Sequence, residues 1–331
     1  MVPCARDRSN DGVALDLIRS GMAAKDGFGA HVPVFRELTS PEGRRWLASV
    51  PELVAALEDE WGVETGTPYT RGGVAAWTAP ATTADGKAAV LKVGWPHREA
   101  RCEADGLRLW AGAGAVRVLR SDPSRWAMLL ERCLPGGPLD EAGLTVHNAL
   151  GTAAGVLRQL WSAPVSADGP FEPLGDVTRE WAQLVRARMD RHRPPFDRGL
   201  VMLGASLLET LPDGGRTVVL HGDFNPGNIL SGTRAPWLAI DPKPMVGDAA
   251  YDPEPLLDQL GDPFAMTDAA RILRARYRFF ADLVDVPAER MLAWGVARRV
   301  ESALWAVAEG HPGGGERSLQ AARLLADAGG L

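Results

Sequence analysis

Two short apolar runs in the second half of the chain each lead to an aspartate. Residues 217–230 read TVVLHGDFNPGNIL and residues 237–244 read WLAIDPKP. The first run delivers Asp223 in a glycine-flanked loop, Asn228 follows five residues later, and the second run delivers Asp241. The pattern predicts a strand, a loop and a hairpin, and the hairpin brings Asn228 and Asp241 to the same end.

These side chains are of the types that phosphoryl transfer from ATP requires. A carboxylate receives the proton of the acceptor hydroxyl, and magnesium takes oxygen ligands. An Asp, an Asn and a second Asp at these offsets supply that set. One such residue in a glycine-flanked loop is usually a turn residue, but three between two apolar runs favour a site.

Lysine is rare in this chain, since only four of its 36 basic residues are lysines. Each lysine is therefore a candidate for a role that arginine cannot take. Lys92 lies near the end of the stretch 89–93, which we expect to be the second strand of a hairpin with a glycine-containing turn. A helical repeat follows and places the carboxylates of Glu99 and Glu103 on one face, among apolar residues.

The predicted elements divide the chain in two. Strands are expected before residue 132, and helices dominate after a loop rich in proline and glycine at 133–138. We therefore expect an α+β fold with a loosely ordered tail at 1–30, a β-containing N-terminal lobe at 31–132 and a mainly helical C-terminal lobe at 133–331. Helices are expected after Ser40, with a break at Pro51, and at residues 146–161, 178–190, 198–210, 265–284 and 288–309.

Charge and cysteine usage exclude several classes of protein. The formal net charge is −6 and no basic run is present, which disfavours nucleic acid and anionic membranes as partners. The three cysteines are widely spaced and form no metal-ligand pattern. No apolar stretch resembles a signal peptide or a membrane span. We therefore expect a cytoplasmic protein.

The motif H-G-D-x-x-x-x-N, with the aspartate of I-D-P thirteen residues later, resembles the catalytic segment of the aminoglycoside phosphotransferase family. These are small-molecule kinases with a bilobal protein-kinase-like fold. The longer segments around this motif, LHGDFNPGNIL and WLAIDPKPMVGDAAYDP, resemble those of the branch that contains streptomycin 6-phosphotransferase and hydroxyurea phosphotransferase. The resemblance covers roughly residues 35–310. It implies ATP as phosphoryl donor, magnesium as the metal and a small antibiotic as acceptor.

The resemblance also implies a role for each motif residue. Asp223 would be the catalytic base or the carboxylate that orients the hydroxyl, and Asn228 and Asp241 would be the magnesium ligands. Lys92 would hold the α and β phosphates and pair with Glu103. Glu99 remains a competing partner for Lys92, and the remaining nucleotide contacts would come from backbone groups of Gly72, Gly73, Glu131 and Cys133.

The sequence departs from protein kinases in their motif positions. Gly222 stands where protein kinases have the arginine of H-R-D, and Pro242 stands where they have the phenylalanine of D-F-G. No A-P-E motif follows, so we expect no activation loop controlled by phosphorylation. A P-loop motif is also absent.

Acidic residues gather after the second aspartate loop, with six of them and one lysine between residues 241 and 262. They could form a solvated helix face, or a negative rim that attracts a cationic antibiotic. The candidate substrate carboxylates are Asp248, Glu254, Asp258 and, in a helix further on, Glu301. By the resemblance Asp252 would brace the catalytic loop, and we expect His221 to be a hydrogen-bonded core histidine.

The expected function is therefore an ATP- and magnesium-dependent phosphotransferase that inactivates an antibiotic and confers resistance, with streptomycin-like aminoglycosides and hydroxyurea as leading acceptors. A kinase of a metabolite alcohol, such as a sugar or an amino alcohol, is an alternative. So is a non-catalytic nucleotide-binding module, although the complete set of Lys92, Asp223, Asn228 and Asp241 argues against it. Nothing in the sequence implies a protein partner.

Overall fold

The computed structural model describes residues 40–69, 75–166 and 168–331. The chain divides into two compact units, which are taken one at a time below. The sheet unit runs up to Gly112 and includes Val116–Cys133, while the helical unit comprises Ala113–Ala115 and Leu134–Leu331. The expected tail, and with it residues 1–30, lies outside the described residues, as do Gly72 and Gly73.

The sheet unit is built on a five-stranded antiparallel sheet with the strand order β1-β2-β3-β5-β4. Its strands are β1 (Val63–Thr65), β2 (Ala76–Thr83), β3 (Ala88–Gly94), β4 (Val118–Asp122) and β5 (Ala127–Glu131). The helices of this unit are α2 (Pro41–Trp61), the short 3₁₀ helix η3 (Arg98–Ala100) and α3 (Glu103–Trp110). The expected hairpin containing Lys92 is thus β2 and β3.

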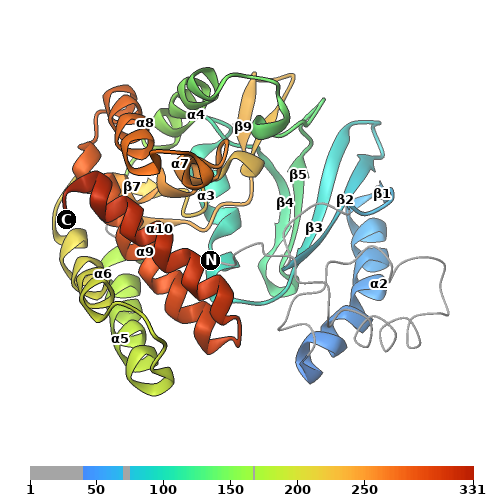
Figure 1. Cartoon of the computed structure of the whole chain (residues 1–331). Helices are drawn as coiled ribbons and strands as arrows, with labels where there is room; N and C mark the ends of the chain where they lie inside the picture. The colour runs from blue at the N-terminus through green and yellow to red at the C-terminus, as the bar shows by residue number, and fades with distance from the viewer. Residues whose placement is uncertain (1–39, 70–74, 167) are drawn as a thin grey trace. The chain divides into compact units, whose positions relative to one another are not determined.

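Helix α2 lies against the sheet (Figure 1) and begins where the sequence predicts. Ser40 caps it by accepting a hydrogen bond from the Gly43 backbone N–H at 3.0 Å. The expected break at Pro51 is wrong, because the helix continues to Trp61. A proline inside a helix costs about 3 kcal/mol. Burial of the apolar face of α2 against the sheet offsets that cost; the buried residues are Val50, Val54, Leu57 and Trp61 from α2 and Trp77, Leu91, Val93 and Leu129 from the sheet.

Strand alternation decides where Lys92 points. Leu91 and Val93 are fully buried in the core shared with α2. Successive side chains of a strand face opposite sides of the sheet, so Lys92 lies on the face away from that core. Its register partners are Thr78 on β2 and Met128 on β5, which places Lys92 on the central strand of the five.

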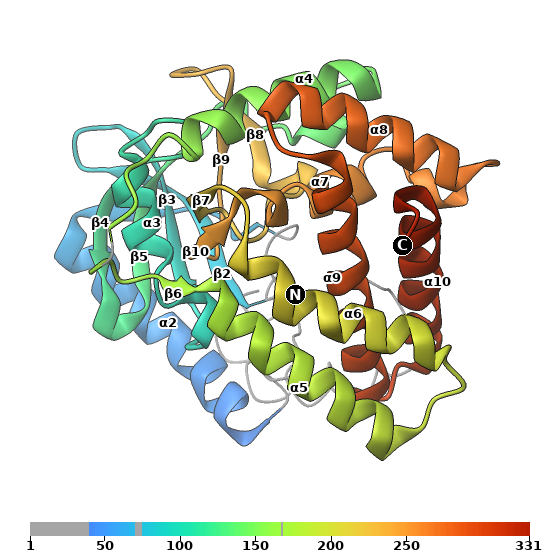
Figure 2. The same ribbon diagram turned by 90° about the vertical axis from the view of Figure 1, so that its left-hand side faces the viewer.

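The helical unit contains most of the helix in the described chain. Its helices are α4 (Val146–Leu160), α5 (Leu174–His192), α6 (Arg198–Thr210), α7 (Glu254–Gln259), α8 (Ala269–Val284), α9 (Ala288–Ala308) and α10 (Pro312–Gly329). Helices α5 and α6 lie side by side, and α9 lies beside α10 (Figures 1 and 2). Helix α9 is buried along most of its length, so it forms the core of this unit.

Two small sheets complete the helical unit. One has the strand order β6-β10-β7, with β6 at Glu172–Pro173, β7 at Thr217–Leu220 and β10 at Met245–Asp248. The other pairs β8 (Ile229–Ser231) with β9 (Trp237–Ala239). The predicted α+β class, with strands in the N-terminal part and mainly helices in the C-terminal part, is confirmed. Within the described ranges no helix is both long enough and apolar enough to span a bilayer.

Candidate active site

The buried side chain of His221 holds the loop after β7 in place. Strand residues 218–220 and the His221 side chain are buried. The imidazole bridges two backbone groups: Nε2 lies 3.1 Å from the Ile240 carbonyl oxygen, and Nδ1 accepts from the Asp223 N–H at 3.3 Å. These contacts assign the proton to Nε2. Burial lowers the pKa of the imidazole, although nearby carboxylates oppose the effect, so the ring is neutral. The expected core histidine is confirmed.

Asp252 fixes the same loop from a second direction. Its carboxylate accepts the backbone N–H groups of His221 at 2.9 Å and Gly222 at 2.8 Å, and the Trp161 indole N–H at 3.0 Å. The side chain is fully buried, and burial raises its pKa although His221 and these hydrogen bonds act to lower it. Three donors converging on one buried carboxyl leave the loop little freedom.

Gly222 explains one departure from protein kinases. Its φ is +81°, and a Cβ at this position would lie 2.1 Å from the Lys243 carbonyl oxygen. An arginine therefore cannot replace it without moving the backbone. The Lys243 N–H donates to the His221 carbonyl oxygen at 2.7 Å, so the two aspartate loops lie directly against each other.

Asp223 stands at the tip of this loop, half-buried between buried neighbours. Its Oδ2 accepts from the Lys243 ammonium at 2.7 Å, and its Oδ1 accepts from the Asn225 amide at 3.1 Å. Burial raises the pKa of this carboxyl, but the Lys243 charge and the hydrogen bonds outweigh burial and bring the pKa below its ordinary value. Asp223 is therefore ionised at neutral pH.

Asn228 and Asp241 are brought together by the hairpin of β8 and β9. Ile229 pairs with Ala239, and the Ile240 N–H donates to the Asn228 carbonyl oxygen at 2.9 Å. Asp241 follows directly, with a left-handed φ of +56° that aspartate tolerates better than most residues. The hairpin predicted from the sequence is confirmed.

The Asn228 amide is oriented by the backbone of the catalytic loop. Its Nδ2 donates to the Asp223 carbonyl oxygen at 2.9 Å, which directs the amide oxygen away from that carbonyl. Asn228 and Asp241 are both partly exposed, while Phe224, Ile229 and Pro242 beside them are buried. An amide oxygen and a carboxylate held in this way are hard donors, and they fit a hard cation such as magnesium.

In the sheet unit, Lys92 is paired with Glu103. Its ammonium lies 2.6 and 2.8 Å from the two carboxylate oxygens, and the side chains are 12% and 4% exposed. Glu103 begins α3, whereas Glu99 lies exposed on η3, one turn earlier. The structure thus brings together Lys92 and the carboxylate that the resemblance favours.

Residues 64–310 match the family described as aminoglycoside/hydroxyurea antibiotic resistance kinase. The chain belongs to this family. It is 35% identical to the streptomycin 6-kinase of Streptomyces griseus over 270 residues, which are 81% of this chain and 87% of that protein. It is 33% identical to the hydroxyurea phosphotransferase of Kitasatospora aureofaciens over 287 residues, which are 86% of this chain and 81% of that protein.

The fold of this family member is similar to that of solved structures. A thermostable mutant of an aminoglycoside phosphotransferase, crystallised as a ternary complex with ADP and hygromycin B, matches with a TM-score of 0.62. The match has 15% sequence identity and covers 85% of this chain and 99% of that chain. The predicted protein-kinase-like fold and the predicted family branch are therefore both confirmed.

The backbone N–H of Glu131, which belongs to an expected nucleotide contact of this kinase, is already hydrogen-bonded. The Glu131 N–H donates to the Arg117 carbonyl oxygen at 2.8 Å, and the Glu131 carboxylate accepts from the Arg117 N–H at 3.0 Å. Its N–H is thus used inside the sheet unit, so a contact from Glu131 to adenine would use its carbonyl oxygen. Cys133 is half-buried, two residues beyond the end of β5.

Most of the acidic residues after Asp241 are buried; these are Asp248, Asp252, Glu254 and Asp258. Glu254 and Asp258 on α7 are 2% and 4% exposed, so they line neither a solvated helix face nor a rim. Glu254 lies 3.1 Å from Arg298 and 3.0 Å from Arg299. Asp258 lies 2.9 Å from Arg299 and accepts the Tyr277 hydroxyl at 2.9 Å. Two arginines of α9 therefore neutralise the acidic face of α7.

The other two candidate substrate carboxylates are also paired internally. Asp248 is 3% exposed and accepts from the Arg290 guanidinium and the Trp294 indole, both at 2.6 Å. Glu301 is mostly buried on α9 and lies 2.9 Å from Arg188. Their charges are thus offset within the helical unit. Each of the four candidate carboxylates thus has an arginine partner within the helical unit.

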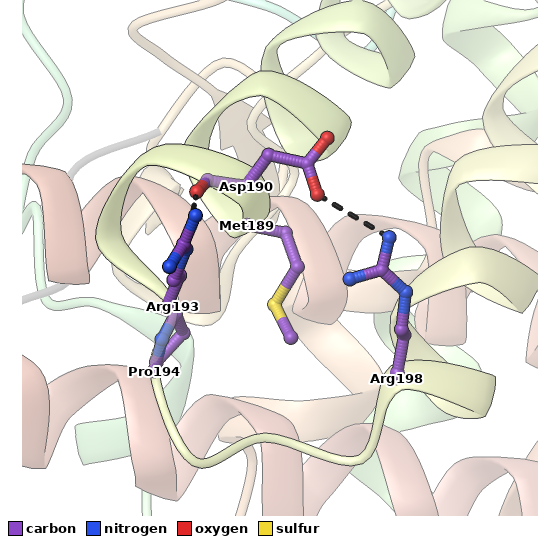
Figure 3. Close-up of a pocket in the computed structure, with 5 residues that line it drawn as sticks. All are labelled: Met189, Asp190, Arg193, Pro194 and Arg198. Atoms are coloured by element: carbon purple, nitrogen blue, oxygen red, sulfur yellow. Dashed lines mark hydrogen bonds and ion pairs between the residues drawn. The ribbon is translucent and has the colours of Figure 1, made fainter.

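A separate cavity of about 480 Å³ lies at the connection between α5 and α6 (Figure 3). It is lined by Met189, Asp190, Arg193, Pro194 and Arg198. Arg198 and Asp190 form an ion pair at 3.3 Å, and both side chains are about two-thirds exposed. None of the expected site residues lines this cavity.

Proposed function

We propose that this protein transfers the γ-phosphate of ATP to a hydroxyl group of a small antibiotic, thereby inactivates it, and confers resistance. The observation that carries the proposal is the loop built around Asp223. An ionised carboxylate is held there beside an oriented amide and a second aspartate, by contacts from His221 and Asp252. Membership of an antibiotic resistance kinase family supports the same chemistry.

In the proposed reaction the acceptor hydroxyl oxygen forms a bond to the γ-phosphorus. The bond between that phosphorus and the oxygen bridging it to the β-phosphate breaks, and ADP leaves with the electron pair. The hydroxyl proton passes to the Asp223 carboxylate and from there to water. Because the pKa of Asp223 is low, its first task is to orient the hydroxyl, and it takes the proton late in a loose transition state.

Asn228 and Asp241 would hold magnesium in this reaction. When bound, the metal would supply positive charge to offset the charge of the phosphates. Lys92, kept in place by Glu103, would contact the α and β phosphates, and we assign nucleotide binding to the sheet unit. The Glu131 carbonyl and the Cys133 backbone would meet the adenine; Gly72 and Gly73 remain proposed phosphate contacts.

Two acceptors are proposed, a streptomycin-like aminoglycoside and hydroxyurea. Relatives that bear each of these names support them, at 35% and 33% identity. We propose that the reaction takes place in the cytoplasm, where ATP is abundant, and that it needs no protein partner. The metabolite-alcohol kinase is the remaining enzymatic alternative.

The deciding experiment incubates the protein with ATP, magnesium and one acceptor at a time, and detects the added phosphate by mass spectrometry. We expect a phosphorylated product with streptomycin or hydroxyurea, and far slower product formation with the Asp223→Asn variant. Phosphorylation of only a sugar or an amino alcohol would contradict the antibiotic assignment. ATP binding without turnover on any acceptor would favour the non-catalytic module.

A further inference from the structure

Lys243 contacts the proposed catalytic aspartate, and the reaction described above gives it no role. Its ammonium lies 2.7 Å from Asp223 Oδ2. The two side chains are 25% and 17% exposed, so both remain accessible to a substrate. A lysine this close to a carboxylate that orients the acceptor is a candidate for the transfer step itself.

The backbone of Lys243 is held in place independently of its side chain. It is flanked by two buried prolines, Pro242 and Pro244, whose φ angles are fixed by their rings. Its N–H donates to the His221 carbonyl oxygen at 2.7 Å, and its own carbonyl oxygen fills the space left open by Gly222. The side chain therefore starts from a fixed point next to the catalytic loop.

Lys243 differs from the other cationic side chains considered for the site in being able to meet the γ-phosphoryl group. Asp223 also interacts electrostatically with Arg298, but that side chain is 1% exposed and bound to Glu254. Arg298 is thus too deeply buried to meet a substrate. Lys92 is assigned to the α and β phosphates, and besides magnesium no cationic side chain has been assigned to the γ-phosphoryl group.

We propose that Lys243 is a catalytic residue that contacts the transferring phosphoryl group, with its ion pair to Asp223 as the resting state. The proposal rests on the proposed function. In a loose transition state, charge spreads over the three equatorial oxygens of the phosphoryl group. An ammonium beside the carboxylate that holds the attacking hydroxyl is placed to stabilise that charge. It does so without exchanging a proton, since bond making and breaking remain as described above.

The test compares Lys243→Met with Lys87→Met. Lys87 also lies 2.7 Å from an aspartate, Asp85, but its side chain is 79% exposed in the turn between β2 and β3. Kinetics are measured with the acceptor identified by mass spectrometry. We expect kcat of Lys243→Met to fall about 10²- to 10³-fold, as on removal of one donor to a transition-state oxyanion. The KM for ATP should change little, and Lys87→Met should match the wild type.

A binding measurement gives a readout that needs no acceptor. Calorimetry is carried out with magnesium and ADP, with and without tetrafluoroaluminate, a mimic of the transferring phosphoryl group. We expect Lys243→Met to bind ADP normally and to lose the extra affinity that tetrafluoroaluminate provides. If the wild type phosphorylates no antibiotic but this loss is seen, the acceptor assignment fails and the role of Lys243 stands.

Three results would overturn the assignment of Lys243. The first is a kcat and a tetrafluoroaluminate gain in Lys243→Met that equal those of the wild type. The second is an equal loss of ADP affinity with and without the mimic, which would make the ion pair structural. The third is full activity in Lys243→Gln, because this variant keeps a hydrogen-bond donor to Asp223 and lacks the charge.

Discussion

The close approach of Gly222 to Lys243 yields a quantitative prediction. In Gly222→Ala the new Cβ would lie 2.1 Å from the Lys243 carbonyl oxygen, so the two aspartate loops must separate by more than an ångström. Forcing a group into a packed site costs about 1–3 kcal/mol. The left-handed φ of +81° adds about 1–2 kcal/mol for a residue with a Cβ. We expect the free energy of unfolding to fall by about 2–5 kcal/mol.

Gly310 offers a matched control in the same unit. Its φ is also +81°, but nothing lies within 4 Å of a Cβ built on it. Gly310→Ala therefore carries the backbone strain without the collision and should cost about 1–2 kcal/mol. The difference between the two variants, measured by urea unfolding, isolates the clash. Separation of the loops should also lower kcat of Gly222→Ala, because Asp223 and Lys243 lie on opposite sides of the contact. Equal stability losses in both variants would refute the reasoning.

Three further predictions concern charged residues. Asp223→Asn should lower kcat by about 10² or more, the range of a lost general base, while calorimetry shows unchanged ADP affinity. Lys92→Arg should lower kcat/KM about tenfold or more, since a planar guanidinium cannot replace the ammonium beside Glu103; unchanged kinetics would make Lys92 an ordinary strand residue. Burial, with Glu254 alongside, raises the pKa of Asp258 to about 7, although Arg299 acts to lower it. This raised pKa favours the folded state at low pH, so unfolding free energy should fall as pH rises from about 4 to about 7. Asp258→Asn should flatten that slope, and an unaltered slope would contradict the raised pKa.

The catalytic hairpin could be predicted because its information is local. The short apolar stretches 218–220, 229–230 and 237–240 are separated by short loops, and Asp223, Asn228 and Asp241 lie in or beside those loops. Strand pairing over so short a separation needs little loop closure. The contacts that hold the loop were harder to predict from the sequence, because Asp252 and Trp161 come from distant parts of the chain.

Helix α10 was missed for a physical reason. It begins with Pro312 and a run of three glycines, which indicate a loop when read alone. Proline is well tolerated in the first turn of a helix. Gly315 is required by packing, since a Cβ there would lie 2.7 Å from the Ala303 carbonyl oxygen of α9. The glycine thus permits close approach of two helices, and only the tertiary contact distinguishes this from a flexible turn.

The paired carboxylates change the argument about the acceptor. A negative rim would have favoured a polycationic aminoglycoside over the uncharged hydroxyurea. Glu254 and Asp258 instead lie buried with Arg298 and Arg299, residues about 40 positions further along the chain. The acidic residues lie close together in the sequence, but their arginine partners lie far from them, so the ion pairs could not be predicted from the sequence.

An arginine partner neutralises each of the four candidate carboxylates. Their charge therefore gives no reason to expect tighter binding of the cationic antibiotic than of hydroxyurea. Exposed charge selects a ligand only where it is uncompensated, and a buried ion pair contributes little field outside the protein. The choice of acceptor must then come from the shape and hydrogen bonding of groups that meet the hydroxyl beside Asp223. Streptomycin and hydroxyurea differ greatly in size, so a competition assay with both present would show a preference set by fit. Such a preference should persist at high salt, whereas a rim of free carboxylates would lose it as salt screens the charge.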